Sequence, residues 1–71
     1  MDQYVIYERP IDYPSYFVVR KVIIGRGTVL MVDPPFKLAK TLEEARAAVP
    51  NKMQRIARHP DDDSVIVEVW I

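Results

Sequence analysis

The feature that most constrains the fold is a long apolar run at residues 15–24, which reads YFVVRKVII from Tyr16 to Ile24. Both faces of this run are rich in β-branched or aromatic residues. Such residues prefer strands, and a strand that is apolar on both faces is typical of the middle of a sheet rather than of its edge. The run therefore predicts a long central strand.

Shorter alternating segments on both sides predict further strands. In residues 3–8, Tyr4 and Ile6 point to one face, and Val5 and Tyr7 point to the other. Gly25-Arg26-Gly27 predicts a hairpin tip that leads into a third strand at 28–32. Residues 53–58 predict either a short strand or an extension of the helix before them. In a last strand at 65–70, alternation separates Val65, Val67, Val69 and Ile71 from Ile66, Glu68 and Trp70. Proline-rich or polar turns interrupt the pattern at 9–14, 33–35 and 59–64.

The clearest helix signal covers residues 41–49. Thr41 is a candidate N-cap, and Glu44 follows three residues later, which is the spacing of a capping box. Pro50 and Asn51 end the helix. A narrow apolar stripe at helical spacing gives it one face to bury, made of Leu42, Ala45, Ala48 and Val49.

These elements predict an α+β fold of order β-β-β-α-β-β, with one short helix packed on one face of an antiparallel sheet. The length of 71 residues allows a single domain, residues 1–71. One helix covers one face only, so apolar surface remains on the other, and such surface commonly marks a partner interface. We expect a homodimer through this face. The alternative is that the 33–41 loop, with Phe36 and Leu38, folds back over it.

Composition excludes several classes of protein. Hydrophobic residues make up 49%, and ten Lys and Arg balance ten Asp and Glu, so the chain is a globular domain rather than a disordered one. No apolar run approaches the roughly 18 residues of a membrane span, and the first residues show no signal peptide. The absence of cysteine removes disulfides, thiolate catalysis, zinc fingers and iron–sulfur ligation. We expect a cytoplasmic protein without a membrane partner.

No catalytic or metal-binding set assembles from the remaining motifs. His59, Asp61 and Ser64 have the side chains of a hydrolytic triad but lie in one turn, where a solvated turn is expected. Asp61-Asp62-Asp63 lacks the alternating spacing of a calcium loop and is interpreted as a charged hairpin tip. The glycines at 25 and 27 lack the lysine and helix of a phosphate loop. The sequence predicts no enzyme, no cofactor and no metal.

Charge is unevenly distributed along the chain. Residues 20–58 hold nine basic and three acidic side chains, a net +6, whereas residues 59–71 carry −4 and residues 1–19 carry −2. Such a dipolar pattern steers charged partners. Direct nucleic-acid binding is possible but not favoured, because a pI near 6.5 lacks the positive footprint typical of such proteins. The four tyrosines of the first 16 residues are interpreted as core and cross-strand aromatics.

Two stretches of the chain carry a resemblance. One runs from Tyr4-Val5-Ile6-Tyr7-Glu8-Arg9-Pro10 through Asp12-Tyr13-Pro14 to Phe17-Val18-Val19-Arg20; the other comprises Thr41-Leu42-Glu43-Glu44-Ala45-Arg46, Asp61-Asp62-Asp63 and Ile66-Val67-Glu68-Val69-Trp70. With these the chain resembles a family of short uncharacterised proteins from bacteria and their phages. The resemblance implies a bacterial or phage origin and no known activity, catalytic residue or cofactor.

The sequence thus predicts a non-enzymatic protein–protein interaction module, of adaptor or inhibitor type, that binds another protein or itself. One alternative is an accessory nucleic-acid-binding protein that uses the basic 20–58 segment. Another is a phage-encoded inhibitor of a host defence complex, with the aspartates at 61–63 imitating a nucleic-acid backbone. Interfaces are enriched in Tyr, Trp and Arg, so the candidate partner-binding residues are basic side chains near the first hairpin and exposed aromatics. They are Tyr13, Arg20, Lys21, Arg26 and Trp70.

Overall fold

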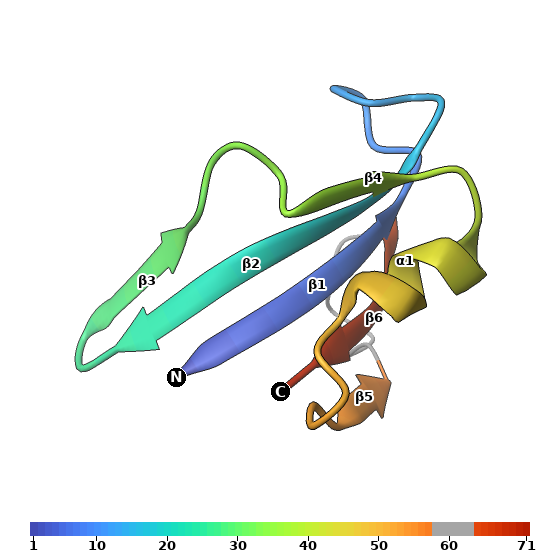
Figure 1. Ribbon diagram of the computed structural model, residues 1–71. Coiled ribbons are helices and arrows are strands. Elements are labelled where there is room, and N and C mark those ends of the chain that lie inside the picture. The colour runs from blue at the N-terminus through green and yellow to red at the C-terminus, as the bar shows by residue number, and fades with distance from the viewer. Residues whose placement is uncertain (58–63) are drawn as a thin grey trace.

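The computed structural model describes residues 1–57 and 64–71, which form one mostly antiparallel six-stranded sheet with a short helix packed against it. This is the predicted α+β fold (Figure 1). The described helix is too short to cross a membrane. In chain order the elements are β1 (Asp2–Glu8), β2 (Phe17–Gly25), β3 (Thr28–Met31), β4 (Lys37–Ala39), α1 (Leu42–Ala48), β5 (Arg55–Ala57) and β6 (Ile66–Trp70).

The apolar run at 15–24 forms β2, which has neighbours on both sides as predicted. The strand order is β3-β2-β1-β6-β5, and β4 also pairs with β2. β1 runs antiparallel along most of β2, from Asp2 opposite Ile23 to Glu8 opposite Phe17. The strand alternative for 53–58 is confirmed over Arg55–Ala57, which pairs with β6.

β4 was not predicted, because the segment after Asp33 was expected to be a loop. β3 and β4 are two halves of one interrupted strand beside β2. The N–H of Val32 donates to Lys21 O at 2.9 Å, and the N–H of Phe36 donates to Val19 O at 2.8 Å. Between these bonds Pro34 and Pro35 have no N–H to donate, so the chain leaves the sheet there and then returns to it.

Helix α1 begins at the predicted N-cap, Thr41, although the return bond to Glu44 comes from Lys40 rather than from Thr41. The N–H of Glu44 donates to Thr41 Oγ1 at 3.1 Å, and the carboxylate of Glu44 accepts from the N–H of Lys40 at 3.2 Å. Its buried residue, Ala45, faces the sheet. The core between helix and sheet consists of Tyr4, Ile6, Val19, Ala39, Ala45 and Val49, with Phe17, Leu42, Met53, Val67 and Trp70 packed around it.

Phe36 lies on the helix side of the sheet. Its ring meets the ring of Tyr4 edge-on, with 5.0 Å between the centroids. The alternative in which Phe36 covers the second face is therefore wrong. Leu38 does lie on that face, opposite Val18, but it remains 37% exposed.

The predicted alternation fails at the start of β6. Ile6 pairs with Glu68, yet Tyr7 pairs with Ile66, so the register shifts by one residue between the two pairs. Ile66 therefore shares a face with Tyr7 rather than with Glu68 and Trp70, while Val67 packs against the helix-side core. A β-bulge of this kind places an extra residue in one strand and reverses the facing of the residues beyond it.

Candidate functional site

The face of the sheet opposite α1 is largely apolar, and no described helix covers it. We call it the open face. Its side chains follow from the register, because directly opposed residues in antiparallel strands share a face. Val5, Val18 and Val22 are buried among their neighbours, whereas Val29, Met31, Leu38 and Ile56 are between 37% and 72% exposed. The open face comprises Gln3, Val5, Tyr7, Val18, Arg20, Val22, Ile24, Val29, Met31, Leu38, Ile56, Ile66 and Val69.

A hollow of about 630 Å³ opens on this face. The loop between β1 and β2 supplies one wall, and Ile11 in that loop is 99% exposed. Met31 at the end of β3 and Asp33 just beyond it supply another wall. The complete lining is Tyr7, Pro10, Ile11, Asp12, Arg20, Met31, Asp33 and Val65. An apolar hollow with a few convergent charges is a typical binding site for an apolar side chain or a small ligand.

Arg20 is the fixed charge of the hollow. Its side chain is 13% exposed, and its Nη2 donates to Asp12 Oδ2 at 2.7 Å, while Nη1 lies 3.6 Å from Asp33 Oδ1. The two carboxylates are 55% and 86% exposed, so their outer oxygens face solvent. The arrangement joins both loops to β2 and leaves one more negative than positive charge at the rim.

A second polar cluster lies on the helix side, around Glu68. Its carboxylate accepts from Arg46 Nε at 2.8 Å and Nη2 at 3.1 Å, and from Trp70 Nε1 at 3.2 Å. Arg55 Nη1 lies 3.6 Å away. Glu68 is only 4% exposed; its burial raises its pKa, but the hydrogen bonds from Arg46 and Trp70 and the charges of both arginines outweigh this and hold the pKa below its ordinary value. The same bond and charge raise the pKa of Arg46. The cluster ties α1 and β5 to β6.

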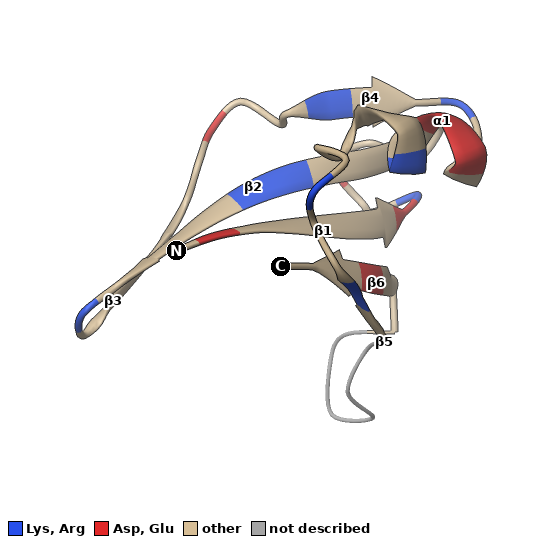
Figure 2. Ribbon diagram, turned by 60° about the horizontal axis from the view of Figure 1, so that its bottom comes forward, with Lys and Arg blue, Asp and Glu red and all other residues tan. Residues whose placement is uncertain are grey.

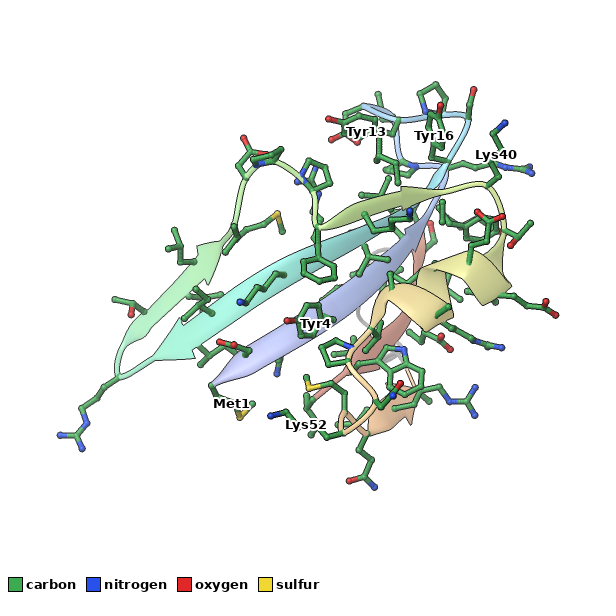
Figure 3. All side chains as sticks on the ribbon, viewed as in Figure 1. Met1, Tyr4, Tyr13, Tyr16, Lys40 and Lys52 are labelled. Carbon is green, nitrogen blue, oxygen red and sulfur yellow. The ribbon has the colours of Figure 1, made fainter. Side chains whose placement is uncertain are left out.

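The five predicted partner-binding residues do not form one surface. Arg20 lies in the hollow, and Tyr13 is half-buried in the β1–β2 loop, where its N–H donates to Pro10 O (Figure 3). Lys21 is on the other face, 3.6 Å from Asp2, and Arg26 is exposed at the β2–β3 tip. Tyr13 and Trp70 were both expected as exposed aromatics, but both are half-buried, Trp70 beside the helix-side core.

The three carboxylates of these sites were not predicted: Asp12, Asp33 and Glu68. The sequence around Glu68 could have indicated a buried ion pair. Glu68 is the single acid within the apolar stretch VIVEVW, and a carboxylate on a covered face of a strand requires a buried partner. No sequence pattern indicated the contacts of Asp12 and Asp33 with Arg20, since the two acids lie in separate proline-containing loops that only the fold brings to Arg20.

The basic 20–58 segment does not produce one positive surface in the described part of the chain. Its described basic side chains lie on β2, β4, α1 and β5, at the β2–β3 tip and in the connections on either side of α1 (Figure 2). Several are matched by carboxylates: Arg20 by Asp12 and Asp33, Lys21 by Asp2, and Arg46 and Arg55 by Glu68.

Some predicted motifs lie outside the described residues, namely Arg58, His59 and the aspartates at 61–63. Within residues 1–57 and 64–71, no group of three or more potential metal ligands comes together. Comparisons with protein-family models, with curated proteins and with solved structures find no match to this chain.

Proposed function

We propose that this protein is a small non-enzymatic interaction module, of adaptor or inhibitor type, that docks on another protein through its open face. The observation that carries the proposal is the hollow around Arg20, with exposed apolar side chains at its rim. A large exposed apolar patch bounded by polar groups is typical of a protein interface. The open face, which α1 does not cover, is therefore the surface whose burial against a partner gains the most free energy.

The hollow also indicates what the partner presents. Ile11 and Met31 offer apolar contact, and each is well exposed, at 99% and 46%. Asp12 and Asp33 hold Arg20 between them and turn their free oxygens to solvent. We therefore expect a partner surface that inserts an apolar side chain into the hollow and places a lysine or arginine at its acidic rim.

Nucleic-acid binding has less support. Arg20 lies on the open face, whereas Lys21, Lys37, Arg46 and Arg55 lie on the helix side, and within the residues that the structure describes all of these except Lys37 already pair with carboxylates. Phosphate binding by a protein requires several cations on one surface.

The test compares capture of a protein partner by three forms of the chain. Ile11→Lys places a charge in the hollow at a side chain that is 99% exposed, so folding is unaffected. Ala47→Lys adds the same charge on the exposed side of α1 and serves as the control. We expect the wild type and Ala47→Lys to retain one protein in stoichiometric amount, and Ile11→Lys to lose it. Equal retention by all three forms, or none by the wild type, would refute the proposal. Salt-dependent binding to oligonucleotides by the wild type would favour the nucleic-acid alternative instead.

A further inference from the structure

The outer edge of β3 is exposed and borders the hollow, whose lining includes Met31 and Asp33. All four residues of β3 are exposed, including Val29 at 72%, Leu30 at 60% and Met31 at 46%. β3 is the end strand in the order of the sheet, and together with the end of β2 it projects past the part that α1 covers (Figure 1). Within the described strands it has a neighbour on one side only.

The unpaired backbone groups of this edge can be assigned. The N–H of Val32 donates to Lys21 O, and residues of an antiparallel strand alternate in the direction of their backbone groups. The backbone N–H and C=O groups of Thr28 and Leu30 therefore point to β2. Those of Val29 and Met31 point outward, away from the sheet. Edge strands are ordinarily protected by an internal charge or proline, and Thr28–Met31 contains neither.

We propose that β3 pairs antiparallel with β3 of a second copy of this chain. A two-fold axis normal to the sheet keeps every side chain on its own face, so the register must centre on a residue. With the axis at Leu30, the two leucines meet on one face. On the other face Val29 of each copy meets Met31 of the other, and these two residues exchange their outward hydrogen bonds. This pairing matches apolar side chains throughout and brings no like charges together.

Charge complementarity supports pairing with a second copy. Arg26 is exposed at the tip before β3, and the side chain of Asp33, just after β3, is 86% exposed. Within one chain an extended strand rises about 3.3 Å per residue, so the two side chains lie about 20 Å apart and do not interact. With the axis at Leu30, Asp33 of each copy lies opposite Gly27 of the other, one residue from Arg26, whose long side chain can reach the carboxylate. This gives two ion pairs related by the axis.

The size of the contact sets the expected affinity. Pairing of two short edge strands buries less than the about 800 Å² per partner of a standard interface. We therefore expect a dimer that forms at micromolar concentration. The inference does not rest on the proposed function, because the pairing is set by the backbone edge of β3, although the dimer shares Met31 and Asp33 with the rim of the hollow.

Sedimentation velocity at rising protein concentration tests the dimer. Met31→Pro removes an outward N–H and leaves the hydrogen bonds to β2 in place, so we expect a folded monomer, verified by circular dichroism. A wild type that stays monomeric at every concentration would overturn the proposal. So would a Met31→Pro dimer as tight as that of the wild type. Dissociation by Ile56→Lys without dissociation by Met31→Pro would assign the dimer to the open face instead.

A charge exchange tests the register and the symmetry. Arg26→Glu and Asp33→Lys each replace two attractions by two repulsions, and we expect each to weaken its own dimer about tenfold. An equimolar mixture of the two variants should recover wild-type affinity, because in the heterodimer the introduced glutamate meets the introduced lysine and native Arg26 meets native Asp33. Lys52→Glu, an exposed charge away from β3, is the control and should change nothing. Failure of the mixture to recover affinity would exclude this register.

Discussion

Replacing Glu68 by glutamine isolates the contribution of one buried charge to the fold. Glutamine keeps the shape of the side chain, and its amide oxygen still accepts from Arg46 Nε and Trp70 Nε1. It puts an NH₂ group where Glu68 Oε2 now accepts from Arg46 Nη2 at 3.1 Å, so two donors face one another. The charge that faces Arg55 is also lost.

The magnitude follows from the contacts and their exposure. A hydrogen bond to a charged group contributes about 1.5–3 kcal/mol. Two effects reduce the loss of stability. A glutamine side chain costs less to bury than a carboxylate, and the side chains of Arg46 and Arg55, at 41% and 56% exposed, can hydrogen-bond to water instead. We expect Glu68→Gln to lower the free energy of unfolding by about 1.5 kcal/mol at pH 7. For a chain of this size that corresponds to a fall in Tm of about 10 °C.

The pH dependence separates charge from shape. The pKa of Glu68 is lower in the folded chain than in the unfolded one, so its stabilisation is present above the unfolded pKa of about 4.3 and is lost as pH falls through the folded value. Urea unfolding at a series of pH values from neutral downward should therefore show the wild type and Glu68→Gln converging in acid. Glu8→Gln, which removes an exposed carboxylate at the end of β1, is the matched control. A difference between wild type and Glu68→Gln that stays constant with pH, or no difference at pH 7, would refute the reasoning.

Three further substitutions test local features by urea unfolding. Thr41→Ala removes the hydroxyl that caps α1 and should cost about 1 kcal/mol, and Thr41→Ser should restore most of it. Gly27→Ala should cost about 1 kcal/mol, because the φ of 75° at Gly27 is strained for a residue with a Cβ; an unchanged midpoint would contradict this. Phe36→Ala should cost about 2 kcal/mol through loss of the edge-on contact with Tyr4, and Phe36→Leu should recover part of it.

Local sequence signals predicted the elements whose causes lie within a few residues. Alternation gave the facing of Tyr4 and Ile6 in β1, and the two-faced apolar run gave the central position of β2. The spacing of Thr41 and Glu44 gave the start of α1. In each case the cause is short-range: strand periodicity, or a side chain that bonds a backbone amide three residues away.

Other features depend on residues distant in sequence and could not be predicted in this way. The bulge that reverses Ile66 and Val67 depends on the pairing of β6 with β1, and β4 depends on the free edge that β2 presents after the proline break. For the candidate site, the sequence predicted Arg20 but not the two acids that pair with it. It also grouped Lys21 and Trp70 with Arg20, although both lie on the helix side of the sheet.

The sequence by itself determined that a single short helix must lie on a sheet with apolar residues on both faces, because hydrophobic periodicity depends only on the order of neighbouring residues. Only the tertiary structure decided which charges meet and which apolar side chains stay exposed. Asp12 and Asp33 reach Arg20 from two different loops, and Glu68 collects arginines from α1 and β5. Such contacts arise when the chain closes on itself, and their energies depend on burial that no local pattern specifies.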